Sequence, residues 1–206
     1  MAFITVAKTL PKESTIYVAV SGGVDSMVAL HFLKRKHNVE VLHYVHSNSE
    51  NAHNERDFVV DYCNRHGIIC HVEYQMTSKD KKDSQEENWR KARYQFFKKY
   101  SNVVTGHTLD DAVEWYLFSC FNGLGKFMEY ANGNVVRPFI LTTKEKVLDY
   151  AHQHDVEYIH DVTNDDADFA ARNRIRNSIL PEVLKVNPGI YKVVKKRILE
   201  KLKNEN

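Results

Sequence analysis

The sequence predicts an α/β fold in which a parallel sheet carries helices on both of its faces. Between residues 16 and 121, short apolar runs alternate with amphipathic segments of about 12 to 15 residues. Such alternation is typical of strand–helix–strand units with parallel strands and right-handed crossovers. With 206 residues, 43% of them apolar, the chain can bury one substantial core. In such a sheet a ligand binds at the carboxyl ends of the strands.

Four strands and four helices are expected in this first part of the chain. The strands are expected over about residues 16–20, 39–45, 68–74 and 102–105, where apolar and β-branched side chains gather. The helices are expected over about residues 24–38, through 58–63 to a C-cap at Gly67, and over about 85–99 and 109–121.

The pattern changes beyond Gly123. A turn is expected at residues 132–134, and a capping box at Thr142 and Glu145 predicts a helix that runs to about His154. The final part is helical and basic, with ten Lys or Arg against three Glu from residue 171 onward, although the net charge is only +2. This stretch suggests a local patch for phosphates, and a solvated amphipathic helix is the alternative.

The composition indicates a cytoplasmic protein. No apolar run reaches 18 residues, so no membrane span is expected. The N-terminal residues lack a basic region followed by a long apolar core, so no signal peptide is expected. Three cysteines suit a reducing compartment better than a disulfide framework.

A loop with two adjacent glycines follows the first strand and opens the first helix. It reads Ser21-Gly22-Gly23-Val24-Asp25-Ser26. The glycines allow a tight turn whose N–H groups face one concavity, and the helix N-terminus adds partial positive charge. The serine hydroxyls can donate to phosphate oxygens, and Asp25 can hold a Mg²⁺ that arrives with a nucleotide. An ordinary strand-to-helix turn is the alternative.

This hexapeptide is neither a Walker loop nor a dinucleotide fingerprint, because GxxxxGK[ST] and GxGxxG are both absent. It resembles the SGGxDS pyrophosphate loop of the N-type ATP pyrophosphatases, which activate a carbonyl oxygen as its adenylate. The resemblance implies a Rossmann-like fold of the adenine nucleotide α-hydrolase type, with ATP and Mg²⁺ as cofactors.

Acidic residues gather at the start of the helix expected at residues 109–121. His107 precedes Asp110, Asp111 and Glu114, and Glu114 can share a helix face with either aspartate. The helix dipole favours carboxylates at this end, so simple capping is one interpretation. The other interpretation is an acidic pocket for an ammonium group or a metal ion beside the phosphate loop.

Several strings together resemble the N-terminal catalytic domain of tRNA(Ile)-lysidine synthetase, in order from about residue 15 to 185. They are Ser21–Ser26; Arg90 to Tyr94 with Phe97; Thr105-Gly106-His107 with Asp110, Asp111 and Glu114; Arg137-Pro138-Phe139; Asp161 with Asn164; and Arg172 to Arg176 with Leu180-Pro181. By this resemblance, residues 1–140 form a PP-loop ATP pyrophosphatase core. Residues 141–206 form a helical part that completes the catalytic domain, without separate tRNA-binding C-terminal domains.

The resemblance implies a two-step ligation. ATP adenylates the carbonyl oxygen of the wobble cytidine in an isoleucine tRNA with a CAU anticodon, and pyrophosphate leaves. The ε-amine of free lysine then displaces AMP to give lysidine. A homodimer is a further prediction.

The resemblance also implies which residues form the site. They are, for ATP, Ser21 to Ser26, His46 and Gly106; for Mg²⁺, Asp25; for lysine, Asp111 and Glu114; and for catalysis, Asp25, His107 and Asp111. His107 can orient the reacting carbonyl or relay a proton, or it can be an ordinary hydrogen-bonded histidine. Which carboxylate takes the proton of the attacking amine stays open.

Arginines supply the expected tRNA contacts. Arg90 and Arg93 can reach ATP or tRNA phosphate as bidentate donors, or they can form structural ion pairs. Arg172, Arg174 and Arg176 would face one way on an extended segment, whereas on a helix they would spread. Either arrangement can serve contact with the tRNA backbone.

Two departures from the family pattern keep other functions open. Asn122 stands where the family usually has an arginine before Gly-x-Gly, and residues 46–50 keep the histidine of the second strand but lose a basic residue. One alternative is another PP-loop enzyme that modifies a tRNA base or forms an amide. The other is a tRNA-binding protein without catalysis.

Overall fold

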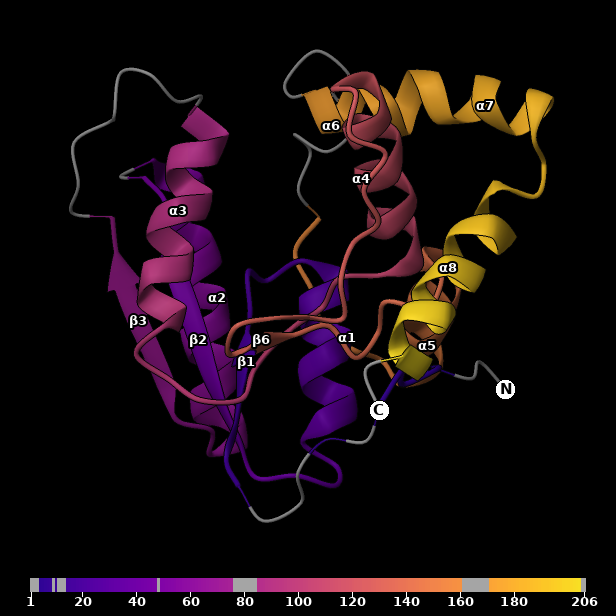
Figure 1. The fold of residues 1–206 in the computed structure, drawn as a ribbon. Coiled ribbons are helices and arrows are strands. Elements are labelled where there is room, and N and C mark those ends of the chain that lie inside the picture. Colours follow the sequence, from indigo (N-terminus) through magenta and orange to yellow (C-terminus); the bar gives the residue numbers. More distant parts are fainter. Residues whose placement is uncertain are drawn as a thin grey trace.

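The computed structural model describes residues 4–8, 10, 14–47, 49–75, 85–160 and 171–204. A six-stranded, mostly parallel sheet runs through this part of the chain, and helices cover both of its faces (Figure 1). The predicted α/β class is therefore confirmed. Asp161 and Asn164, on which the family resemblance partly depends, lie outside the described residues.

The order in which strands are added to the sheet reverses at the first strand. The strands are β1 (Ile16–Ala19), β2 (Val39–Val45), β3 (Cys70–Tyr74), β4 (Val103–Thr105), β5 (Ala131–Asn132) and β6 (Val135–Val136). Their order is β3-β2-β1-β4-β6-β5, and all neighbours are parallel except β5 and β6. The chain thus builds outward from β1 through β2 to β3 and then places β4 on the other side of β1. Ligands bind α/β sheets at such a switch point.

The helices occur in the predicted order. They are α1 (Val24–Leu33), α2 (Glu50–His66), α3 (Gln85–Phe97), α4 (Leu109–Phe121), α5 (Lys144–Gln153), α6 (Ala171–Arg174), a π-helical segment (Ile175–Ile179), α7 (Leu180–Val186) and α8 (Ile190–Asn204). Gly67 ends α2 with φ 63°, so the predicted left-handed C-cap is confirmed.

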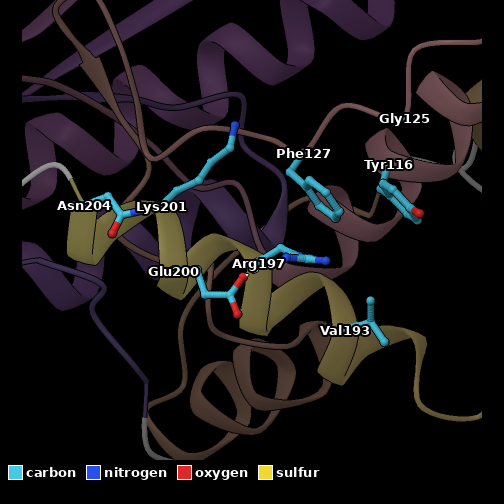
Figure 2. A pocket seen from close by; sticks show the side chains of 8 residues that line it. All are labelled: Tyr116, Gly125, Phe127, Val193, Arg197, Glu200, Lys201 and Asn204. Carbon is cyan, nitrogen blue, oxygen red and sulfur yellow. Dashed lines mark hydrogen bonds and ion pairs between the residues drawn. The ribbon is translucent and has the colours of Figure 1, made fainter.

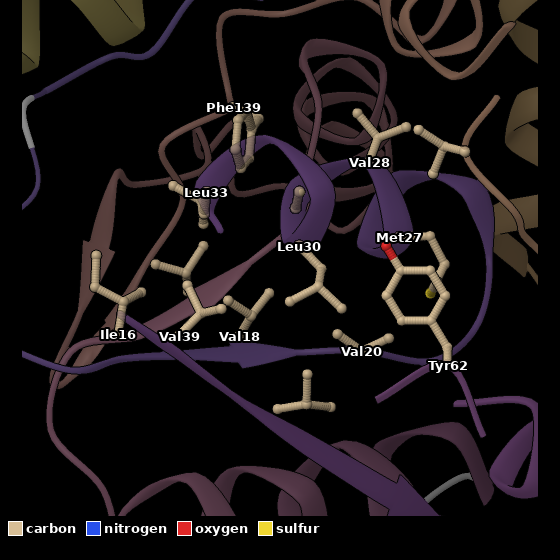
Figure 3. Close-up of a cluster of buried hydrophobic side chains, with 14 of the residues drawn as sticks. Ile16, Val18, Val20, Met27, Val28, Leu30, Leu33, Val39, Tyr62 and Phe139 are labelled. Atoms are coloured by element: carbon tan, nitrogen blue, oxygen red, sulfur yellow. The ribbon is translucent and has the colours of Figure 1, made fainter. Parts of the chain in front are cut away.

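Alternate side chains of β1 pack into hydrophobic clusters on opposite faces of the sheet, because the strand is pleated. Ile16 and Val18 contact the cluster that α1 and α2 cover, shown in Figure 3. Tyr17 packs against the cluster on the opposite face, which α3 covers with Phe97. Helix α5 joins the first cluster through Val147. The segment beyond residue 140 therefore begins by packing against the core that β1 and α1 share.

A separate cluster joins α4 to the C-terminal helices. Leu117 of α4 belongs to it, together with Ile175, Leu180, Val194 and Ile198. Helix α8 buries this apolar stripe and leaves most of its basic side chains exposed, as predicted for an amphipathic basic helix. No helix among the described residues is long and apolar enough to cross a membrane.

Several predicted boundaries are wrong, as three examples show. Helix α1 ends at Leu33 rather than near residue 38, because the Lys36 N–H donates to the Leu33 carbonyl, only three residues back, at 3.0 Å and tightens the last turn. The N-cap of α5 is Thr143 rather than Thr142, whose buried hydroxyl donates to the Thr5 carbonyl at 2.9 Å. Strand β3 also begins two residues later than predicted. Each error lies at an end, where tertiary contacts decide between neighbouring residues.

Candidate active site

The phosphate loop contacts the backbone of the segment between β4 and the acidic helix α4, at the switch point of the sheet. The loop Ser21–Ser26 follows β1, and Gly106 follows β4, its neighbour in the sheet. A Cβ atom added at Gly106 would lie 2.7 Å from the Asp25 carbonyl oxygen and 3.1 Å from the Ser26 nitrogen. Only glycine fits this approach, because both obstructing atoms belong to the backbone. The structure therefore brings together two segments that are 80 residues apart in sequence.

The loop is closed by its own serines and left open at the helix N-terminus. Gly22 adopts φ 97°, a conformation that L side chains rarely adopt. The Ser26 hydroxyl donates to the Gly23 carbonyl at 2.8 Å and accepts the Ser21 N–H at 3.2 Å. Gly23 caps α1 without a side-chain hydrogen bond, so the first N–H groups of the helix can receive an anion.

His43 is a buried residue at this edge that the sequence motifs did not indicate. Its Nδ1 lies 2.8 Å from the Val20 carbonyl, directly before the loop, and burial lowers its pKa. The ring is thus neutral at physiological pH, with Nδ1–H donating to the carbonyl. His43 fixes the point where β1 leaves the sheet. Its alternation with apolar neighbours on β2 looked like ordinary strand pattern, so no local signal could separate it.

His46, expected at the ATP site, lies just beyond β2 in an aromatic environment. Its ring contacts Tyr44 edge-on at 5.2 Å and Trp89 at 5.5 Å between centroids. Burial, followed by the positive charge of Arg93, lowers its pKa to about 4. Because β2 is the neighbour of β1, the ring stands at the same edge of the sheet as the loop. An uncharged ring beside Trp89 suits a nucleobase better than a phosphate.

Asp25 has one oxygen in an ion pair and one without a partner. Its Oδ2 accepts from Lys144 Nζ at 2.6 Å, whereas Oδ1 is buried without a hydrogen bond. Burial raises the pKa of Asp25, and the ammonium of Lys144 opposes this shift. A buried carboxylate oxygen without a donor fits a divalent cation such as Mg²⁺. No local signal marked Lys144, because this contact spans 119 residues of sequence.

The predicted acidic pair exists and is held by two arginines. Arg176 binds Glu114 through two bonds, Nε to Oε1 at 2.5 Å and Nη2 to Oε2 at 3.0 Å. Arg172 Nη2 lies 3.2 Å from Asp111 Oδ1 and 3.5 Å from Glu114 Oε2. The carboxylates that we expected to receive a cation therefore already hold two guanidinium groups of the same chain.

Asp111 both caps α4 and binds a cationic side chain, so the two interpretations of the acidic helix both apply to it. Its Oδ2 accepts from the Thr108 N–H at 2.7 Å and from the Thr108 hydroxyl at 2.9 Å, completing a capping box at the start of α4. Its Oδ1 faces Arg172. One carboxylate thus caps the helix and binds a cation at the same time, and capping fixes its orientation toward the site.

The two carboxyl groups differ in their pKa. Burial raises the pKa of both, but at Asp111 His107, Arg172 and the Thr108 hydrogen bonds outweigh it and lower the pKa to about 2. At Glu114 burial outweighs Arg176, so the pKa stays raised. Asp111 is therefore ionised at any physiological pH, and Glu114 is the more basic member of the pair.

His107 lies between the loop and the acidic pair and carries no charge near neutral pH. Its Nδ1 is 2.8 Å from the Thr105 hydroxyl oxygen. Burial, reinforced by Arg137, Arg172 and other arginines, outweighs the attraction of Asp111 and lowers its pKa to about 4. A neutral imidazole can accept a proton or orient a polar group in this position.

Asp110 serves the architecture of the site. Its Oδ2 accepts the Lys144 N–H at 2.6 Å, which caps α5, and its Oδ1 accepts from the Tyr191 hydroxyl at 2.9 Å. One side chain at the start of α4 thus joins the starts of α5 and α8. The acidic residues of the motif therefore divide their roles, with Asp110 holding helices together and Asp111 and Glu114 binding cations.

The arginines of the C-terminal motif lie on helical backbone, so the helical one of the two predicted geometries holds. Arg172 and Arg176 are four residues apart and share the face that meets Asp111 and Glu114, whereas Arg174 is exposed. Contact of these three residues with tRNA stays a prediction. In this structure only Arg174 presents its side chain mainly to solvent.

The arginines of α3 also differ from each other. Arg90 pairs with Glu87 at 3.0 Å on the exposed side of the helix. Arg93 contributes to the lowered pKa of both His46 and His107, so its charge lies toward the site. Arg137, part of the Arg-Pro-Phe string, is buried and donates to the Glu129 carbonyl at 2.8 Å and to Tyr94 at 3.0 Å. It has a structural role.

A cavity of about 520 Å³ lies away from this edge, between α8 and the outer side of α4 (Figure 2). Its lining includes Tyr116 and Phe127, which stack at 4.6 Å, and Arg197 and Glu200 of α8, which are paired at 3.1 Å. None of the predicted site residues lines it. This cavity is therefore not part of the candidate site at the strand edge.

A phosphate loop at the switch point of a parallel sheet, with an acidic cation-binding pair beside it, defines a nucleotide-binding α/β protein. Residues 3–183 match the family model of the PP-loop domain. The chain belongs to this family.

Curated relatives narrow the similarity. The chain is 33% identical to a tRNA(Ile)-lysidine synthase of Lactiplantibacillus plantarum, over 93% of this chain and 47% of that protein. It is 32% identical to the Bacillus subtilis protein of the same name, over 88% and 43%. It is 33% identical to a Listeria monocytogenes protein named bifunctional TilS/HprT, over 87% and 31%. The resemblance seen in the motifs is thereby confirmed. The chain spans about half or less of the length of these relatives.

Solved structures support the fold. The U34-tRNA thiolase NcsA of Methanococcus maripaludis superposes with a TM-score of 0.70 at 16% identity, over 94% of this chain and 73% of that one. The NH3-dependent NAD synthetase of Campylobacter jejuni superposes with a TM-score of 0.53 at 12% identity, over 93% and 86%. At this identity the likeness concerns the fold alone.

Proposed function

We propose that this protein ligates lysine to the wobble cytidine of an isoleucine tRNA in two steps, adenylation by ATP and displacement of AMP by the lysine amine. The observation that carries the proposal is the backbone contact at Gly106, which sets a phosphate loop and a cation-binding acidic pair side by side. Adenylation needs the first element, and a positively charged amino acid needs the second.

In the first step, the loop Ser21–Ser26 binds the β- and γ-phosphates of ATP through its N–H groups. The orphan oxygen of Asp25 fits Mg²⁺, which supplies charge neutralisation on the phosphates. Trp89 and His46 offer the adenine an uncharged aromatic surface. The carbonyl oxygen of the cytidine forms a bond to the α-phosphorus, and pyrophosphate leaves.

In the second step, Asp111 and Glu114 bind lysine. The ε-ammonium group of lysine replaces Arg172 and Arg176 and donates hydrogen bonds to the carboxylate oxygens that these arginines contact in the structure. The ε-nitrogen then forms a bond to the cytidine carbon while the bond from that carbon to AMP breaks. The amine must lose a proton, and the raised pKa makes Glu114 the more suitable acceptor of the two carboxylates.

Basic side chains outside the site bind the tRNA backbone. Arg174 is exposed on α6, and α8 carries further exposed Lys and Arg. We expect contacts of this kind to set affinity and its salt dependence, and not base identity. We also expect the protein to act in the cytoplasm, in keeping with its free cysteines, and to form a homodimer, which sedimentation analysis tests.

A direct assay tests the function. The protein is mixed with ATP, radiolabelled lysine and an isoleucine tRNA bearing a CAU anticodon, and label on the tRNA is measured with the parent chain and with Asp25→Ala. We expect transfer only with the parent. ATP consumption without transfer over a panel of tRNAs would indicate another PP-loop reaction. Binding of tRNA without ATP consumption, with the cellular effect intact in Asp25→Ala, would indicate a role without catalysis.

A further inference from the structure

Lys144 stands at the phosphate loop although it belongs to the C-terminal part of the chain. It is the first residue of α5, and both of its ends are held by carboxylates of the site. Its backbone N–H donates to Asp110 at 2.6 Å, and its Nζ donates to Asp25 at 2.6 Å. A side chain anchored in this way at its base can reach the mouth of the loop with its charged end.

The ion pair with Asp25 is not needed to hold α5 in place. The helix is already fixed by Val147 and Tyr150 in the core cluster and by the Asp110 cap. About a third of each partner's side chain is exposed, 37% for Lys144 and 34% for Asp25. Ion pairs that water reaches contribute little to folding stability. A role beyond structure therefore accounts better for the position of this ammonium group.

The surroundings of the ammonium are those of a phosphate site. Asp25 follows Gly22 and Gly23, and α1 begins there without a side-chain cap. The N–H groups of this helix start attract anions, and a lysine beside them adds a full positive charge. Lysine suits this position because its flexible stem and three donors let the ammonium change partners without a fixed geometry.

We propose that Lys144 is a phosphate-binding residue of the ATP site. In the structure it holds Asp25, and it moves to the β- and γ-phosphates when ATP binds, which leaves Asp25 for the metal ion. It remains on the pyrophosphate as that group leaves. The inference rests on the proposed adenylation function and adds to it a cation supplied by a segment outside the loop motif.

Binding measurements on four proteins test this role. We compare the parent chain with Lys144→Met, Lys144→Arg and Lys146→Met, using calorimetric titration with Mg·ATP, Mg·pyrophosphate and AMP. Lys146 is the matched control, because it is exposed on the same helix two residues later. We expect Lys144→Met to weaken binding of ATP and pyrophosphate about 10- to 100-fold, the range for a charge-assisted hydrogen bond, and to leave AMP within about twofold. Lys144→Arg should recover most of the loss.

The outcomes separate this inference from the proposed function. If Lys144→Met binds ATP like the parent, or loses ATP and AMP binding equally, Lys144 is no phosphate ligand, while the adenylation proposal stands. If the parent itself binds neither ATP nor pyrophosphate, both proposals fail. Thermal unfolding of the same variants guards against misfolding, since we expect the melting temperature of Lys144→Met to stay close to that of Lys146→Met.

Discussion

The two halves of the site are built in different ways. The phosphate half is a backbone structure, fixed by the positive φ of Gly22 and by the close approach of Gly106 to Asp25. The amine half is made of side-chain charges, in which Glu114 and Arg176 meet across 62 residues of sequence. A backbone site has its donors in place before the ligand arrives, whereas a charged site must release its own cations first.

This difference has a consequence for binding. In the proposed function, phosphates would bind at the start of α1, where no side chain caps the first N–H groups. In the same proposed function, lysine would replace guanidinium groups already bound to Asp111 and Glu114, so part of its binding free energy would offset the loss of these ion pairs. We therefore expect substitutions in the phosphate half to abolish ATP binding. Substitutions in the amine half should change the affinity for lysine alone.

The largest expected effect is that of Gly106→Ala. The new Cβ atom would lie 2.7 Å from the Asp25 carbonyl oxygen, so the loop or the end of β4 must shift. We expect the free energy of unfolding to fall by about 1–3 kcal/mol, as in other overpacked sites, and ATP binding to fall below detection. Denaturant unfolding and nucleotide titration measure the two effects. Gly189→Ala is the control, because a Cβ atom added in this turn would meet only the side-chain oxygen of Asn187, at 3.3 Å. Equal ATP affinity in both variants would show that the loop tolerates the shift and would contradict the comparison.

Glu114→Gln changes the amine half without changing its shape. The amide keeps the size of the buried side chain but loses the charge that holds Arg176. We expect the KM for lysine to rise about 10- to 100-fold, while ATP affinity stays within about twofold of the parent value. Steady-state kinetics with each substrate varied in turn measure both. Glu182→Gln, an exposed carboxylate, should change neither, and a parallel loss of ATP binding in Glu114→Gln would contradict the division into two halves.

The phosphate loop and the acidic helix could be proposed as site elements from the sequence because their signals are local. Adjacent glycines after an apolar run predict a tight turn, and acidic residues three or four apart predict a shared helix face. Both predictions depend only on residues that are close together in the sequence. Lys144 and His43 had no such signal, because each acts through a contact with a distant segment. The ion pair between Arg176 and Glu114 could not be predicted from the sequence for the same reason. Which cation neutralises a carboxylate depends on tertiary packing, and Arg176 belongs to a helical motif whose partner no spacing rule identifies.

The pH dependence of stability tests the protonation state of His107, which lies between the two halves of the site. Its pKa is lowered from 6.5 to about 4 in the folded protein, so the unfolded chain takes up the proton first as the pH falls. The stability due to the neutral ring is complete above pH 6.5 and is lost toward pH 4. His107→Gln should reduce the slope of unfolding free energy in this window by up to about 1.4 kcal/mol per pH unit. Urea unfolding at several pH values measures the slope. His152→Gln, exposed on α5, is the control, and an unchanged slope in His107→Gln would mean that folding does not lower the pKa of His107.

The smallest expected effect belongs to Arg174, which separates tRNA contact from the chemistry of both halves. Arg172 and Arg176 face Asp111 and Glu114, so their substitution changes the acidic pair together with any contact to tRNA. Arg174 is exposed on the other side of the same helical motif. We expect Arg174→Ala to weaken tRNA binding about threefold and to lower the salt slope of that binding by about 1, with the KM for lysine unchanged. Arg172→Ala should weaken tRNA binding and raise this KM as well. Filter binding at several salt concentrations and lysine kinetics distinguish the two variants. If Arg174→Ala raised the KM for lysine while Arg172→Ala did not, the helical face assigned to the acidic pair would be the wrong one.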